Sequence, residues 1–96
     1  MYATLRRIKT QPGQAAEVAR LIEAEYLPQV EGVEGFISYT LVDLGDDEIS
    51  SVGTFTSEAS AHHANETAKS WTAKTLSRYV ASPLEARAGS VLIDRR

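Results

Sequence analysis

The chain has 96 residues, of which 43% are hydrophobic and 24% charged, as is ordinary for one globular domain over residues 1–96. A formal net charge of -3 gives no electrostatic reason to expect nucleic acid or an anionic membrane as partner. The chain has no cysteine, which excludes disulfides and thiolate chemistry, and no apolar run typical of a signal peptide or membrane span, so we expect a cytoplasmic protein.

The first part of the chain predicts a strand followed by a helix. Residues 2–10 mix β-branched and aromatic residues with charges, which favours a strand, and residues 11–13 (QPG) are typical of a turn. From Gln14 onward, apolar residues recur at spacings of three and four, which predicts an amphipathic helix. Pro28 lacks a backbone donor, so we expect this helix to end or kink near Leu27.

Three basic residues, Arg6, Arg7 and Lys9, lie close together near the end of the first predicted strand. Such a group could contact a phosphate or could simply be solvated. Because nothing else in the composition indicates a polyanionic partner, we interpret the group as a solvated strand end.

The middle of the chain predicts an antiparallel hairpin. Residues 31–35 form a loop that leads into a strand over residues 36–43, which are rich in aromatic and β-branched side chains. Residues 44–47 have turn chemistry, and residues 48–56 predict the next strand. Two strands joined by so short a loop pair with each other.

The last part of the chain predicts a helix and a final strand. Ser57 and Glu58 are suited to the start of a helix, because a hydroxyl caps the first N–H groups and an acidic side chain favours the first turn. This helix is expected to run to about Tyr79, and a last strand is expected over residues 84–94.

The order strand, helix, strand therefore occurs twice, which predicts an α+β, ferredoxin-like fold: a four-stranded antiparallel sheet with two helices on one face. The strand over residues 36–43 carries no charge on either side before Asp43. Ile37, Tyr39 and Leu41 would share one side, and the alternate residues, including Phe36, the other. Both sheet faces thus resemble buried faces, while two helices cover only one. We therefore expect a homodimer that closes a dimeric α+β barrel.

The second predicted helix contains both histidines and the only tryptophan, in the segment AHHANETAKSW (residues 61–71). At 100° per residue, His63 points away from the alanine-rich face and His62 lies at its border. His62 and Glu66 could supply two metal ligands, but no third ligand is apparent, so no metal is expected. Asn65 lies within about 40° of the apolar face. Trp71 is interpreted as a core or interface anchor.

Small residues on the strand over residues 48–56 suggest a place for a ligand. If the side that carries Ser51 and Gly53 meets the alanine-rich helix, a hollow would form with Phe55 and Asn65 as walls. Plain close packing of glycine against alanine is the alternative, and the sequence leaves both open. The candidate residues for binding a small aromatic molecule share a place near this hollow: Tyr26, Ser51, Phe55, His62 and Asn65.

Three segments together resemble the antibiotic biosynthesis monooxygenase-like group of dimeric α+β barrels: MYATLRRIK followed by QPG, the loop EGVEGF, and VGTFTSEASA at a strand-to-helix junction. The resemblance extends over nearly the whole chain. It implies homodimers whose sheets face each other. The group includes cofactor-independent quinone-forming monooxygenases, haem-degrading enzymes, isomerases and many members without assigned activity.

The residues on which these activities depend in the group differ here. Phe55 stands at the position of the monooxygenases' strand-end tryptophan, Ser51 at that of their asparagine, and Ala61 at that of their tyrosine. In the haem-degrading members an early asparagine would fall near Thr4 or Arg6, and Trp71 lies in another element than their tryptophan.

We therefore expect a cofactor-independent, monooxygenase-like protein acting on a small aromatic or quinol-type molecule, with no bound cofactor. In such an enzyme His62 and Tyr26 are the candidate acid and base. A noncatalytic small-molecule-binding or interaction protein on the same dimeric scaffold is the alternative, so whether the chain is an enzyme stays open.

Overall fold

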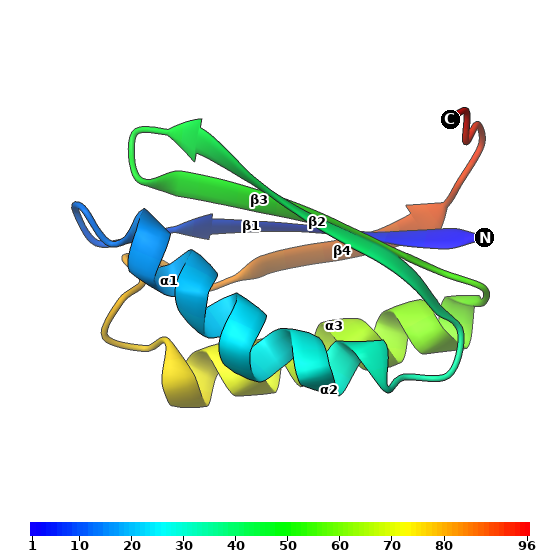
Figure 1. Cartoon of the computed structure of the whole chain (residues 1–96), viewed down its shortest axis with the longest axis horizontal. Helices are drawn as coiled ribbons and strands as arrows, with labels where there is room; N and C mark the ends of the chain where they lie inside the picture. Colours follow the sequence, from blue (N-terminus) through cyan, green and yellow to red (C-terminus); the bar gives the residue numbers. More distant parts are fainter.

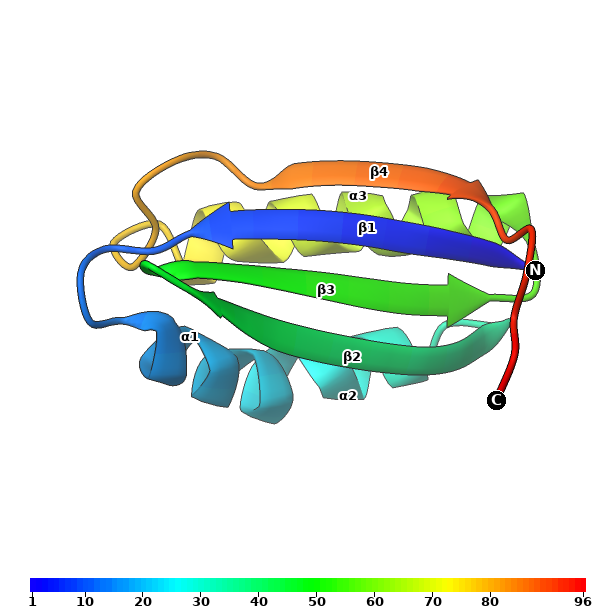
Figure 2. The same ribbon diagram turned by 90° about the horizontal axis from the view of Figure 1, so that it is seen from above.

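A computed structural model describes all residues from 1 to 96 and confirms the α+β, ferredoxin-like arrangement. The strands form one antiparallel sheet in the order β2-β3-β1-β4, and all helices lie against the same face (Figures 1 and 2). None of the helices is long and apolar enough to cross a membrane. The strands are β1 (Tyr2–Lys9), β2 (Phe36–Gly45), β3 (Glu48–Phe55) and β4 (Glu85–Ser90); the helical segments are α1 (Ala15–Leu21), η1 (Ile22–Tyr26), α2 (Leu27–Glu31) and α3 (Glu58–Thr75).

The first helical region contains a π turn, and of the two outcomes expected near Leu27, an end or a kink, the end is wrong. The segment η1 is a π-helical turn in which the N–H of Leu27 bonds to the carbonyl of Ile22, five residues earlier. Pro28 then lies in the first turn of α2, where a missing N–H costs little because the first donors of a helical segment lack partners. The chain therefore stays helical to Glu31, and η1 buries both Ile22 and Tyr26. Single π turns are frequent at functional sites.

The β2–β3 hairpin contains a bulge that changes which side chains face the helices. Phe36 pairs with Phe55, whereas Ser38 pairs with Thr54, so one extra residue, Ile37, is accommodated in β2. The predicted alternation is therefore wrong at the start of this strand. Phe36 joins the helix-side core, and its ring centroid lies 5.9 Å from that of Phe55, while Ile37 is exposed.

Residues 46 and 47 form the tight turn of this hairpin. Asp46 and Asp47 have φ values of 53° and 61°, the left-handed conformation of a type I′ turn, which matches the twist of the paired strands.

The second predicted helix, which is α3, is shorter than expected, and so is the last strand. Helix α3 ends at Thr75 rather than near Tyr79, because the following residues bond to the end of β1: the N–H of Gln11 donates to the carbonyl of Tyr79 at 2.8 Å. Strand β4 stops at Ser90, which pairs with Tyr2, the first residue of its neighbour β1, so residues beyond it have no strand partner. The predicted bounds to Tyr79 and to 94 are corrected accordingly.

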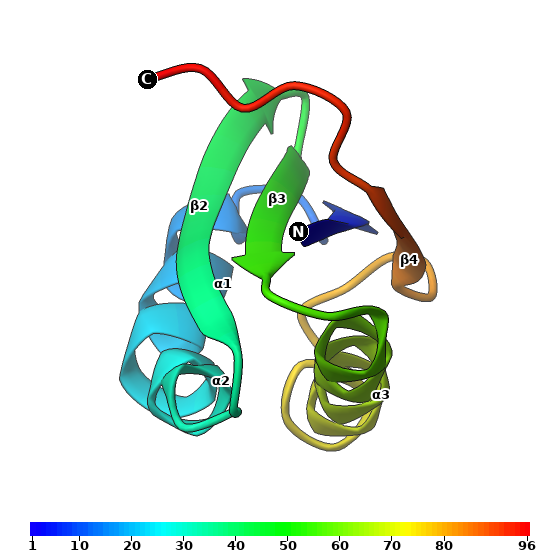
Figure 3. The ribbon, with the colours of Figure 1, turned by 90° about the vertical axis from the view of Figure 1, so that its right-hand side faces the viewer.

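The two faces of the sheet differ in how deeply their apolar side chains are buried. The helix side holds a core of 13 buried hydrophobic residues. On the opposite side Leu5 and Val52 are 54% and 40% exposed, although they are cross-strand partners. The C-terminal segment, with exposed Leu92 and Ile93, crosses the end of the sheet on this open side (Figure 3).

Candidate functional site

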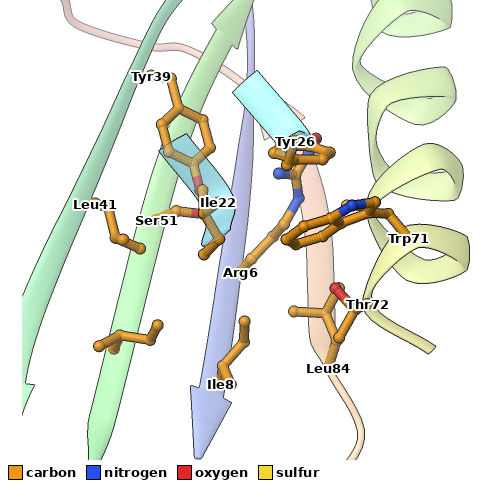
Figure 4. A pocket seen from close by; sticks show the side chains of 12 residues that line it. Arg6, Ile8, Ile22, Tyr26, Tyr39, Leu41, Ser51, Trp71, Thr72 and Leu84 are labelled. Atoms are coloured by element: carbon orange, nitrogen blue, oxygen red, sulfur yellow. The ribbon is translucent and has the colours of Figure 1, made fainter. Parts of the chain in front are cut away.

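A cavity lies between the inner face of the sheet, the π turn η1 and helix α3 (Figure 4). With its mouth it spans about 320 Å³, of which only about 20 Å³ is open to the centre of a water molecule. That space holds about one or two waters, so an aromatic ring enters only if lining side chains move. Nine of the 12 residues that line the cavity are hydrophobic. The full lining consists of Arg6, Ile8, Ile22, Tyr26, Tyr39, Leu41, Ile49, Ser51, Ala68, Trp71, Thr72 and Leu84.

Arg6 of β1 is the one ionisable side chain in this lining besides the tyrosines, and it is 95% buried, with a relative exposure of 5%. Its interpretation as part of a solvated strand end is therefore wrong, although Arg7 and Lys9 are exposed as expected. Arg6 lies on the inward side of β1 together with Thr4 and Ile8, since alternate residues of a strand point to opposite faces.

Two contacts hold the Arg6 guanidinium, and one of its nitrogens has no partner. Its Nε donates to Oδ1 of Asn65 on α3 at 2.8 Å, and its Cζ lies 5.4 Å from the ring centroid of Tyr26. Its Nη2 is buried and has no hydrogen-bond partner. A cation over an aromatic face is attracted to the ring, but a neutral amide and a ring leave the positive charge uncompensated.

Asn65 connects three elements. Its amide Nδ2 donates to the backbone carbonyl of Arg87 on β4 at 3.2 Å, while its oxygen accepts from Arg6 on β1. The side chain is 6% exposed, as its helical phase predicts. Ser57 caps the start of α3, because its Oγ accepts from the N–H of Ser60 at 3.1 Å, so the expected cap is confirmed. The side-chain amide of Asn65 therefore fixes the orientation of the Arg6 guanidinium.

Aromatic side chains form one wall of the cavity. The ring of Tyr26 lies 5.5 Å from that of Trp71 and 6.1 Å from that of Tyr39, measured between centroids. Burial raises the pKa of Tyr26, while the Arg6 charge opposes this shift; burial also raises the pKa of Tyr39, opposed by its hydrogen bond with Ser51. Both hydroxyls are therefore protonated at neutral pH and act as hydrogen-bond donors or acids rather than bases.

The residues predicted for binding are not all brought together. Tyr26 and Ser51 line the cavity, and Asn65 supports it through Arg6. Phe55 packs away from the cavity, among the core residues near Phe36. His62 is exposed and lies 3.5 Å from Glu58, so it does not reach the cavity.

The hollow expected beside Gly53 is closed. A Cβ placed on Gly53 would lie 2.8 Å from Oγ1 of Thr4 and 3.2 Å from Cε2 of Phe55. Glycine therefore allows close packing there, which was the alternative interpretation. The cavity lies further along the same face, at Ser51.

The sequence interpretation missed Arg6, Tyr39, Leu41 and Trp71 as lining residues. The signal for Arg6 was its register: it lies two residues from Ile8, which belongs to the core, and therefore shares its side of β1. Nothing in the local pattern showed that Trp71 and Tyr39 meet around Tyr26, because that contact depends on how α3 and the π turn pack. No cluster of three or more histidine, cysteine or carboxylate side chains is placed to hold a metal ion.

Comparison with known proteins identifies relatives by sequence and by fold. The family model for antibiotic biosynthesis monooxygenase matches residues 1–74, and no curated protein sequence matches. A protein of unknown function from Nitrosomonas europaea is similar in structure, with a TM-score of 0.77 and 23% identity over 99% of this chain and 92% of that one.

Two further solved structures have the same fold. A putative antibiotic biosynthesis monooxygenase from Nitrosomonas europaea gives a TM-score of 0.75 at 14% identity, covering 97% of this chain and 100% of that one. A monooxygenase from the gene ActVA-Orf6 of Streptomyces coelicolor, solved with the ligand Nanaomycin D, gives 0.71 at 18% identity, covering 97% and 92%. Because the family model extends over most of the chain and these folds agree, the protein belongs to the antibiotic biosynthesis monooxygenase family.

Proposed function

We propose that the protein binds a small aromatic, quinol-type molecule in the cavity beneath the sheet and oxidises it with O2, without a bound cofactor. The observation that carries this proposal is the cavity itself, where Tyr26, Tyr39 and Trp71 offer ring contacts around the buried Arg6. Aromatic walls with a few polar groups are the usual form of sites for small organic molecules. The family and the monooxygenase among the structural neighbours support the same class of reaction.

In such a reaction a phenol and O2 give a para-quinone and water. One oxygen atom enters the product, the other leaves as water, and the phenol supplies all the electrons. The protein's part is to exclude water, to hold the ring and to stabilise the phenolate from which electrons leave. Arg6 is suited to the last task, because a buried cation stabilises negative charge strongly in a site of low polarity.

One observation favours the alternative, a noncatalytic binding protein. The cavity contains no evident base, because the tyrosine hydroxyls have raised pKa values and both histidines lie outside the lining. A substrate would therefore have to enter already ionised, or lose its proton to water at the mouth. A binding protein needs no such step.

Oxygen uptake with a dihydroxynaphthalene, measured without added cofactor, separates the two functions. The monooxygenase proposal requires enzyme-dependent O2 consumption and quinone absorbance in equal amounts. The variant Leu41→Trp places a larger ring at a half-buried residue of the lining and should abolish both signals, whereas His63→Trp, on the exposed side of α3, should not. Binding without O2 uptake would favour the noncatalytic alternative, and absence of both would overturn the proposal.

We also propose that the protein is a homodimer formed through the open sheet face. Leu5, Val42 and Val52 are exposed there in a single chain, and the apolar residues Leu92 and Ile93 extend over the same side. Apolar side chains gathered on one uncovered face mark an interaction surface. The cavity lies on the opposite side of the sheet and is formed by residues of one chain.

A further inference from the structure

The charge of Arg6 has no counter-charge in this protein. The ion pairs of the chain involve other basic residues, and no aspartate or glutamate lines the cavity. An ionised group taken out of water is strongly unfavourable unless it is paired. Proteins therefore seldom bury an arginine without a carboxylate beside it.

Bulk solvent does not compensate the charge, because the side chain is only 5% exposed, and a neutral water in the cavity would leave the charge uncompensated. Asn65 occupies Nε, and the Tyr26 ring lies beside Cζ at 5.4 Å, so the unpartnered donor is Nη2. Arg6 lines the cavity, so the cavity is open volume beside the guanidinium. Figure 4 shows Arg6 rising from β1 towards the ring of Tyr26, with Trp71 to one side.

We infer that the cavity selects an anionic ligand: an oxyanion, either carboxylate or phenolate, carried on a small planar aromatic body, with Nη2 of Arg6 as its anchor. This inference rests on the proposed function and narrows its ligand class. The oxyanion completes the hydrogen bonds of the guanidinium and compensates its charge, and the ring lies among the aromatic side chains. Neutral aromatic molecules fit the same walls but leave the charge uncompensated.

Asn65 is a positioning residue in this arrangement. By accepting from Nε and donating to the Arg87 carbonyl, it ties the guanidinium to α3 and β4 and leaves the Nη side for the ligand. A buried charge held in place before binding loses little conformational entropy when the anion arrives. Arginine is also preferred to lysine where a planar oxyanion is recognised.

The test compares benzoate with its neutral analogue benzamide. Trp71 is the only tryptophan and lines the cavity, so its fluorescence reports binding at the site. A charge-assisted hydrogen bond of ordinary strength predicts that wild-type protein binds benzoate roughly tenfold to a hundredfold more tightly than benzamide. A second arm titrates 4-nitrophenol over pH: affinity that rises as the phenol ionises identifies phenolate as an accepted source of the oxyanion, while benzoate affinity reports the carboxylate.

Arg6→Met should reduce the preference for benzoate to about twofold or less, and Arg6→Lys should retain part of it. If benzamide binds wild-type protein as tightly as benzoate, or if the preference survives in Arg6→Met, the anionic ligand class is wrong while aromatic binding stands. If no aromatic probe changes the fluorescence, the proposed function fails as well. Should Arg6→Met not fold, the wild-type comparison of the two probes still decides.

Discussion

Replacing Asn65 by leucine should destabilise the protein markedly, because it leaves the buried Arg6 without its strongest contact. The change removes the 2.8 Å bond from a charged donor, which contributes roughly 1.5–3 kcal/mol, and the bond to the Arg87 carbonyl, which contributes about 0.5–1 kcal/mol. The expected loss of unfolding free energy is therefore about 2–4 kcal/mol. For a domain of this size, each kcal/mol lowers Tm by about 4–8 °C, so Tm should fall by at least about 8 °C.

Urea unfolding at neutral pH, followed by Trp71 fluorescence, measures this loss. His63→Leu is the matched control: it places the same side chain on the same helix, but on its exposed side, and should change stability by no more than about 0.5 kcal/mol. A double-mutant cycle isolates the contact itself. In the Arg6→Met background, Asn65→Leu should cost only about 1 kcal/mol, because no guanidinium is then left unpaired. If the cost of Asn65→Leu is the same in both backgrounds, the Arg6–Asn65 bond does not stabilise the folded protein by this amount.

Three other perturbations test separate parts of the structure. Gly53→Ala should lose about 1–3 kcal/mol in denaturant unfolding, because its Cβ would press on the fully buried Thr4 and Phe55; Gly89→Ala, with no atom within 4 Å, should be near neutral, and equal effects would contradict the packing. Val52→Asp should convert dimer to monomer in sedimentation, whereas Ser70→Asp on the exposed side of α3 should not; a monomeric wild type at micromolar concentration would refute the dimer. Stability should decline as pH rises above about 10, because Tyr26 and Tyr39 ionise more readily when unfolded; Tyr26→Phe should reduce this decline, and an unchanged decline would contradict the raised pKa.

The fold could be predicted because its signals are local and repeated. The turn at residues 44–47, the cap at Ser57 and the helical periodicity each indicate one element, and their order leaves few topologies. The predicted ends of helices and strands are wrong where contacts between residues distant in sequence decide the structure. Residues 76–80 continue a helical pattern, yet Tyr79 and Val80 pair with the residues that follow β1, Gln11 and Thr10. Phe36 turned inward because a bulge absorbs one residue, which no alternation pattern reveals.

The candidate site could be predicted only in part. Tyr26 and Ser51 lie on faces that periodicity assigns to the core, and both line the cavity. Arg6 was wrongly assigned to a solvated strand end because it was grouped by its charge with Arg7 and Lys9. Its position in the alternation of the strand would have placed it on the inward side. A basic residue flanked at two-residue spacing by inward-facing neighbours is either a strand end or a buried charge. Only the packing of α3, which brings Asn65 to within 2.8 Å of it, distinguishes these cases.

The strand β1 also explains why the two proposals can be tested independently. Its inward residues, with Arg6 among them, are buried against the helices, whereas Leu5 and Arg7 point to the open face. Because successive side chains of a strand alternate, a change at Leu5 or at its partner Val52 meets the proposed dimer interface and leaves the guanidinium in place. A change at Arg6 alters the guanidinium and leaves the proposed dimer interface in place. Loss of anion preference in a protein that remains dimeric would therefore place that preference in the cavity, and its persistence in a Val52→Asp monomer would show that one chain suffices.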